Sequence, residues 1–101
     1  MIEVEWTSSA IRDLTGIFEH IAKDSARYAI VVVDRITSRT NQIASFPYSG
    51  EMVPEYRRTD IREVIEYSYR VIYLVTADRI YILAVIHGAI MLPDTPPKNA
   101  G

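Results

Sequence analysis

The chain has 101 residues, of which 49% are hydrophobic and 24% are charged, and it contains no cysteine. This length and composition predict one folded domain, and the lack of cysteine excludes disulfides, thiolate metal sites and a cysteine nucleophile. Eleven basic and thirteen acidic side chains give a formal charge of −2, divided almost evenly between the two halves of the chain. Unaided binding to a nucleic-acid backbone is therefore not expected.

The N-terminal segment predicts a strand followed by a helix. Residues 2–6 alternate apolar and acidic side chains, as in a half-buried strand, and residues 7–9 offer helix caps. The next apolar residues are spaced for one face of a helix: Ile11, Leu14, Ile17, Phe18 and Ile21. The N-terminus lacks the basic region of a signal peptide, and no apolar run approaches the roughly 20 residues of a membrane helix. We therefore expect a cytoplasmic protein that does not enter membranes.

Residues 26–43 allow two interpretations. The run from Tyr28 to Val33 alone is typical of a buried strand, whereas the longer segment keeps one helical stripe. That stripe contains Ala26, Ala29, Ile30, Val33, Ile36, Thr40 and Ile43. We predict a second helix, which would form an antiparallel helical hairpin with the first. Val31 and Val32 would then point away from the core, toward either a partner or the first helix.

A proline and a glycine within residues 46–50 end the second helix, and residues 51–60 predict an irregular polar segment. Strand-like runs follow at residues 61–67, 69–76 and 80–87, and the last should be central because it is apolar on both faces. The order β-α-α-β-β-β predicts an α+β fold, with the helical hairpin packed on an antiparallel sheet of three or four strands. A fourth strand would arise if the first paired beside the last. Residues 1–92 would form the single domain and residues 93–101 a flexible tail.

Few side chains offer metal or cofactor chemistry. His20 and His87 are the only histidines, and neither has a second ligand at the spacing of a zinc site. The four glycines are not arranged as a phosphate-binding loop. We therefore expect no metal, no cofactor, and surface positions for both histidines.

Arg70, Tyr73 and His87 form the one candidate catalytic cluster. An arginine could hold a phosphate, and a tyrosine or histidine could move a proton. However, Arg70 and Tyr73 fall on opposite faces of their predicted strand. We favour a structural interpretation, in which Arg70 pairs across the sheet with Glu63 or Glu66.

An ordered set of short motifs over residues 4–93 resembles the RelE/ParE toxin superfamily, and ParE-type toxins in particular. The motifs are Val4-Glu5-Trp6-Thr7, Ala10, Asp13-Leu14, Phe46-Pro47, Gly50, Val53-Pro54-Glu55, Arg62-Glu63, Tyr69-Arg70-Val71-Ile72-Tyr73, Val85-Ile86-His87-Gly88-Ala89 and Leu92-Pro93. The resemblance implies a helical hairpin against a small antiparallel sheet, in agreement with the pattern.

The resemblance also implies a type II toxin–antitoxin module. The partner would be a cognate, ParD-like antitoxin with a DNA-binding N-terminal part and a C-terminal segment that folds on the toxin, by helix-in-groove and strand addition. The residues that we predict to contact the antitoxin are Phe18, Tyr28, Val31, Val32 and Arg35.

Members of the superfamily divide by activity. RelE-like toxins cut mRNA on the ribosome with a set of basic residues, whereas ParE-like toxins poison DNA gyrase. Glu63 and Glu66 occur here where RelE-like toxins carry lysines, and these carboxylates would repel RNA phosphate. The resemblance therefore favours a gyrase inhibitor over a catalyst. The alternatives are a ribosome-dependent mRNA endonuclease that uses Arg70, Tyr73 or His87, and an inactive antitoxin-binding module.

The resemblance places the target-facing end of the chain at residues 87–91. The residues that we predict to contact the target are Arg70, His87, Gly88, Ile90 and Met91. ParE-like sequences commonly carry an arginine where this chain has Ile90, so this position is a departure from the family pattern.

Overall fold

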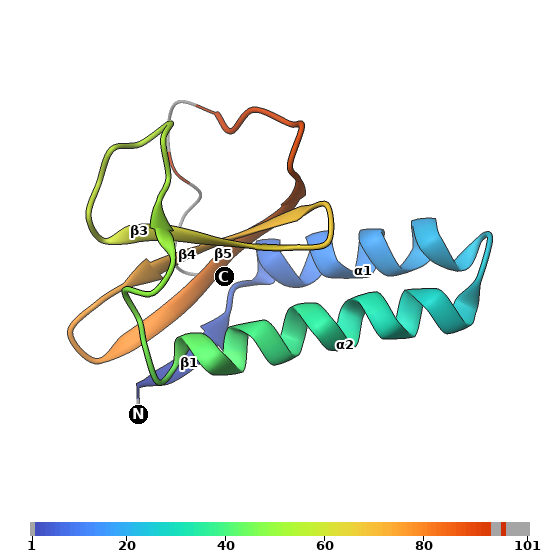
Figure 1. Cartoon of the computed structure of the whole chain (residues 1–101), viewed down its shortest axis with the longest axis horizontal. Coiled ribbons are helices and arrows are strands. Elements are labelled where there is room, and N and C mark those ends of the chain that lie inside the picture. Colours follow the sequence, from blue (N-terminus) through green and yellow to red (C-terminus); the bar gives the residue numbers. More distant parts are fainter. Residues whose placement is uncertain (1, 94–95, 97–101) are drawn as a thin grey trace.

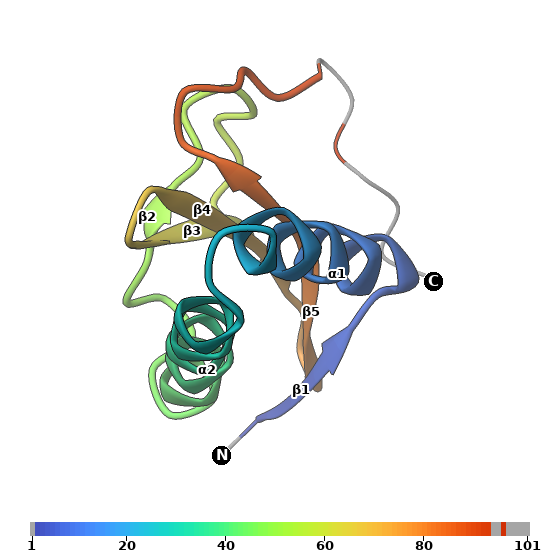
Figure 2. The ribbon, with the colours of Figure 1, turned by 90° about the vertical axis from the view of Figure 1, so that its right-hand side faces the viewer.

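The structure is a computed structural model, and it describes residues 2–93 and 96. The elements are, in chain order, β1 (Glu3–Trp6), α1 (Ser8–Ala22), α2 (Ala26–Ile43), β2 (Glu51–Met52), β3 (Ile61–Glu66), β4 (Tyr69–Val75) and β5 (Arg79–His87). The two helices lie side by side against one face of the sheet (Figures 1 and 2). The predicted α+β architecture and the helical hairpin are confirmed. In the described part of the chain, neither helix is long and apolar enough to cross a bilayer.

The sheet has five strands in the order β1-β5-β4-β3-β2. It is mixed rather than antiparallel as predicted, because β1 pairs in parallel with β5, with Glu3 opposite Arg79 and Trp6 opposite Ile82. The helical hairpin carries the chain from the β1 edge to the other side of the sheet, where the β3–β5 meander begins. The additional strand is β2, which forms within the segment expected to be irregular and pairs with Arg62 and Glu63 of β3.

The second helix is formed as predicted, and Ala29, Ile36, Thr40 and Ile43 of the predicted stripe are buried, but Ile30 is not. Ile30 is 53% exposed, whereas Val32 is only 1% exposed and packs in the core. The prediction that Val32 points away from the core is therefore wrong, while Val31 is exposed as expected. Residues 30–33 are all apolar, so helical spacing alone allows more than one stripe through them. Packing against the sheet selects the face of Val32 and Ile36.

The sheet is covered on both faces, and for this reason β5 is apolar on both. On the helix side the core contains Val32 and Ile36 of α2, together with alternate residues of β4 and β5. On the other side Val53, Leu83 and Leu92 belong to a second apolar cluster. Leu92, the last residue of the predicted domain, is buried in that cluster. Of the predicted tail, residues 94, 95 and 97–101 lie outside the described residues.

Side chains from the start of α1 complete the hydrogen bonding of β5 where β1 ends. The Thr7 hydroxyl donates to the Ile82 carbonyl at 2.8 Å and also accepts the Ala10 N–H as the helix cap. One turn later, the Asp13 carboxylate accepts the Val85 N–H at 3.0 Å. Burial raises the pKa of Asp13, although the Val85 N–H acts in the opposite direction. Thus α1 both covers the sheet and supplies hydrogen-bond partners to the part of β5 that extends beyond β1.

We expect Asp13→Ala to lower the free energy of unfolding by about 1–3 kcal/mol, because the Val85 N–H would lose its acceptor in a buried position. Asp13→Asn is the matched control, because it retains a carbonyl acceptor without the charge that burial disfavours. Urea unfolding of the three proteins at pH 7 measures the difference. Equal stability of Asp13→Ala and the wild type would contradict this role for Asp13.

Candidate functional site

Arg70 lies at the centre of an ion cluster on the sheet face opposite the helices. Its Nη1 and Nη2 atoms donate to the two carboxylate oxygens of Glu55 at 2.8 Å each, and its Nε donates to Glu63 at 2.6 Å. The Arg70 side chain is buried, and Glu63 lies on the neighbouring strand β3, opposite Ile72 and so diagonally across from Arg70. The predicted cross-strand pairing of Arg70 is confirmed with Glu63, whereas Glu66 forms an ion pair with Arg35 of α2.

The hydrogen bonds of this cluster keep its side chains in their charged forms. Donation from Arg70 is the largest cause that lowers the pKa of Glu55 to about 2, and the Glu55 carboxylate in turn raises the pKa of Arg70. Two carboxylates therefore face one guanidinium. Glu55 also accepts the Leu92 N–H at 3.2 Å, which ties the C-terminal segment to the cluster.

The three residues of the catalytic alternative are not brought together. Tyr73 is fully buried on the helix side of the sheet, where its hydroxyl donates to the Pro47 carbonyl at 2.7 Å and accepts the Gly50 N–H at 3.0 Å. Burial raises the pKa of Tyr73. Arg70 is on the opposite face, as the alternation predicts, and His87 is exposed at the end of β5. The structure therefore separates the phosphate-binding candidate from Tyr73.

Residues 87–91 form an exposed apolar segment between two fixed ends. At one end, the Gly88 N–H donates to the Ser68 carbonyl at 2.7 Å, beside the β3–β4 turn. At the other end, Leu92 is buried and bound to Glu55. Between these ends Ile90 is 55% exposed and Met91 is 77% exposed. Four of the predicted target contacts thus share one segment, whereas Arg70 is connected to it through Glu55.

The predicted antitoxin contacts separate into two surfaces. Phe18 lines a cleft of about 260 Å³ between the helices with Leu14, Thr15 and Val33. Tyr28, Val31 and Arg35 are exposed on α2, at spacings that place them along one side of the helix. Val32 belongs to neither surface because it is buried in the core.

Three further exposed aromatic or aliphatic residues of the helices and the β3–β4 turn were not predicted from the sequence. Ile11 and Ile30 were assigned to the buried stripes but are exposed. Tyr67 occupies the β3–β4 turn, where its ring meets that of Tyr28 edge-on at 6.3 Å between centroids. Tyr67 was predicted as the last residue of the strand-like run 61–67, but β3 ends at Glu66 and Tyr67 lies in the turn.

The geometry of the described residues also bears on metal binding. Among residues 2–93 and 96, no group of three or more histidine, cysteine, aspartate or glutamate side chains could hold a metal ion.

Comparison with protein families identifies the chain. Residues 4–92 match the family described as the ParE toxin of the type II toxin-antitoxin system, parDE. This match spans nearly the whole chain, and the chain therefore belongs to the ParE toxin family of the RelE/ParE superfamily. A comparison with curated protein sequences gave no significant match.

Two solved structures share the fold at low sequence identity. A chain of the chromosomal ParDE toxin–antitoxin system from P. aeruginosa is 20% identical, with a TM-score of 0.71, and the match covers 86% of this chain and 96% of that chain. A chain of the RelBE2 toxin–antitoxin complex from Mycobacterium tuberculosis is 22% identical, with a TM-score of 0.56, and the match covers 85% of this chain and 96% of that chain. At these identities the likeness is one of fold.

We expect Glu55→Gln to lower the free energy of unfolding at pH 7 by about 1.5–3 kcal/mol, because a charge-assisted hydrogen-bond pair to a buried guanidinium is lost. The folded-state pKa of Glu55 is about 2, below its ordinary value of 4.5. Its stabilisation is therefore present above pH 4.5 and is lost as the pH falls toward 2. The difference between the wild type and Glu55→Gln should shrink over that range in urea unfolding.

Asp60→Asn is the matched control for this experiment. Asp60 also pairs with an arginine, Arg58, at 2.7 Å, but both side chains are exposed. An exposed pair is worth less than about 1 kcal/mol. A loss at Asp60→Asn as large as that at Glu55→Gln would contradict the special role of the buried cluster.

Proposed function

We propose that this toxin inhibits DNA gyrase by protein–protein contact and that a cognate antitoxin neutralises it. The observation that carries this proposal is the state of Arg70, whose guanidinium is buried and bound by two carboxylates. Cleavage of RNA needs positive charge aimed at the scissile phosphate. Here the charge of the one candidate arginine is directed to Glu55 and Glu63, which supports an inhibitor rather than a nuclease.

We assign the contact with gyrase to residues 87–91. Ile90 and Met91 expose apolar surface on a segment whose two ends are fixed, so binding would order few additional residues. The side chain at position 90 carries no charge, and we therefore propose an apolar contact here rather than a salt bridge. Gyrase acts on the bacterial chromosome, and we therefore also propose that the toxin acts in the cytoplasm.

We assign the main antitoxin contact to the cleft between the two helices. Leu14, Phe18 and Val33 line this cleft, and the exposed side chains of Ile11 and Ile30 belong to the same two helices. An amphipathic helix that inserts apolar side chains is the occupant that such a cleft fits. The two solved structures of similar fold come from toxin–antitoxin systems, which supports a partner of this kind.

Met91→Asp tests the gyrase contact. We expect the wild-type toxin at micromolar concentration to inhibit supercoiling by purified gyrase, and Met91→Asp to weaken the inhibition at least tenfold, because a carboxylate would be desolvated in an apolar interface. Phe46→Asp is the control, because Phe46 is 70% exposed and lies just after α2. Absence of inhibition by a folded wild-type toxin would contradict gyrase as the target. Equal inhibition by Met91→Asp and the wild type would contradict the assignment of the contact to residues 87–91.

Expression of the toxin without antitoxin separates the alternatives. Growth arrest with DNA breaks and intact mRNA is the expected result. Arrest with cleaved mRNA and intact DNA would instead identify an endonuclease of RelE type. No arrest would identify an inactive antitoxin-binding module, and Ile90→Arg would then test whether the departure at position 90 is responsible.

Ile30→Asp tests the antitoxin contact. We expect it to weaken binding to the antitoxin encoded beside the toxin at least tenfold in calorimetry. Its effect on the toxin's own stability should stay within about 0.5 kcal/mol, because Ile30 is exposed in the free toxin. Tyr48→Asp, which alters an exposed aromatic residue beyond the end of α2, is the control. Equal affinities of Ile30→Asp and the wild type would contradict this assignment.

A further inference from the structure

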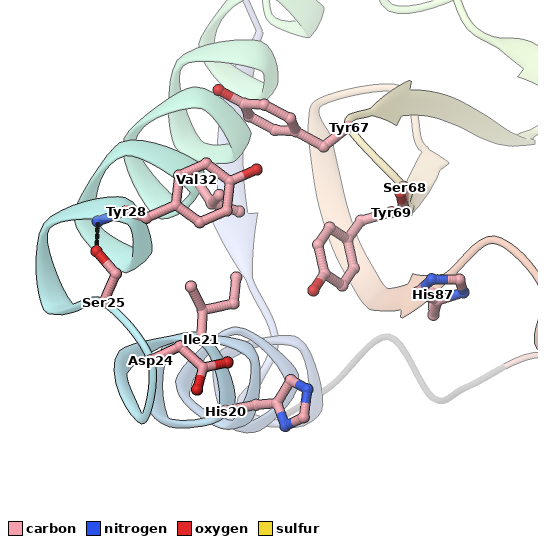
Figure 3. A pocket seen from close by; sticks show the side chains of 10 residues that line it. All are labelled: His20, Ile21, Asp24, Ser25, Tyr28, Val32, Tyr67, Ser68, Tyr69 and His87. Carbon is pink, nitrogen blue, oxygen red and sulfur yellow. Dashed lines mark hydrogen bonds between the residues drawn. The ribbon is translucent and has the colours of Figure 1, made fainter.

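A separate cleft opens where the helical hairpin and the β3–β4 hairpin both turn. It encloses about 430 Å³, and Figure 3 shows side chains from both hairpins around it. This volume lies within the range of about 300–1,000 Å³ that is typical of ligand pockets. The cleft differs from the one at Phe18, because none of the residues that line that cleft contributes to it. The lining residues are His20, Ile21, Asp24, Ser25, Tyr28, Val32, Tyr67, Ser68, Tyr69 and His87.

Aromatic side chains form much of the wall of this cleft. Tyr28 and Tyr67 meet edge-on, with their ring centroids 6.3 Å apart, and both are substantially exposed. Tyr69 projects between the two turns and meets the His87 ring edge-on at 5.9 Å. Ile21 supplies aliphatic surface, and Val32 lies beneath the lining, almost fully buried. The cleft therefore combines π faces with an apolar lining.

The described lining contains one carboxylate, that of Asp24 in the turn between the helices, two histidines, His20 and His87, and neither lysine nor arginine. The Arg35 guanidinium lies over the Tyr67 ring, so Asp24 and the rings of Tyr28 and Tyr69 remain for a cation from a partner. A cation above the face of a tyrosine ring is attracted by the ring quadrupole. A long cationic side chain can in addition bury its methylene groups against apolar surface while its charged end stays near water. Both features match this lining.

The β3–β4 turn fixes the position of one ring in the wall. Tyr67 has φ 55°, as the two-residue turn between the paired Glu66 and Tyr69 requires at its first residue. This conformation costs a bulky residue about 1–2 kcal/mol. The Arg35 guanidinium lies 5.8 Å from the Tyr67 ring centroid and, with Tyr28, holds the ring in place. The strained turn thus directs an exposed aromatic ring to the edge of the cleft.

We propose that this cleft receives one cationic side chain, an arginine, from a protein partner of the toxin. Its guanidinium would stack on the rings of Tyr28 and Tyr69 and pair with the Asp24 carboxylate, and its methylene groups would contact Ile21. This site adds an electrostatic anchor to partner recognition, beyond the apolar contacts proposed at the helical cleft. It does not depend on gyrase being the target, so its test needs neither gyrase nor growth arrest.

The test is an NMR titration of the whole toxin with N-acetyl-arginine-N-methylamide. The matched probe is the citrulline analogue, which has nearly the same shape but no charge. We expect saturable shifts at Asp24, Tyr28 and Tyr67, with binding of the arginine probe at least threefold tighter than that of the citrulline probe. Equal affinities, or no saturable shift at these residues, would overturn the proposal.

Two variants with a matched control locate the site. We expect Asp24→Asn to weaken binding of the arginine probe about fivefold, at the upper end for an exposed ion pair. We expect Tyr28→Leu to weaken it about threefold, within the range of exposed cation–π contacts. Asp34→Asn removes an exposed carboxylate of α2 that lies outside the cleft lining, and it should leave binding unchanged. Because Asp24 and Tyr28 are exposed, both variants should fold, which urea unfolding checks. Equal weakening by Asp34→Asn would show a general charge effect and would also overturn the proposal.

Discussion

The buried guanidinium of Arg70 is the constraint on which one whole side of this protein depends. A charge on that face must be compensated, because an unpaired buried cation is strongly destabilising. Glu63 pairs with it from the neighbouring strand, and Glu55 pairs with it from the segment between β2 and β3. Since Glu55 also holds the Leu92 N–H, the same cluster fixes the far end of residues 87–91. Residues 87–91 are therefore held in position by an ion cluster to which none of them belongs.

This arrangement also determines which surfaces of the toxin remain available to partners. The strongest arginine–carboxylate contact is internal, so the surfaces available to partners are mainly apolar or aromatic. The exposed segment around Ile90 and Met91, the helical cleft at Phe18 and the tyrosine-lined cleft at Asp24 differ in chemistry. His87 belongs both to the exposed segment and to the lining of the tyrosine-lined cleft. A partner in that cleft would therefore lie next to the proposed target contact, which gives an antitoxin a direct way to obstruct it.

The sequence predicted local structure well where one period was unambiguous. Alternation in the predicted strand placed Arg70 and Tyr73 on opposite faces, and the expected pairing of Arg70 with a strand carboxylate is made by Glu63. It failed at Ile30 and Val32, because four successive apolar residues are compatible with more than one helical stripe. Glu55 lies within one of the family motifs, but no pattern in the neighbouring residues predicted its contact with Arg70, 15 residues away.

The sequence by itself determined the order of the two helices and the four longer strands, the helical hairpin, the interior position of β5 in the sheet and the pairing of Arg70 with a strand carboxylate. These follow from local periodicity and from the rule that buried charge needs a partner. Tertiary structure alone decided the parallel pairing of β1 with β5, the burial of Val32, the capture of Leu92 by Glu55 and the tyrosine-lined cleft. Each of these joins segments far apart in the chain, and the contacts between such segments are set by how whole elements pack rather than by the pattern within any one of them.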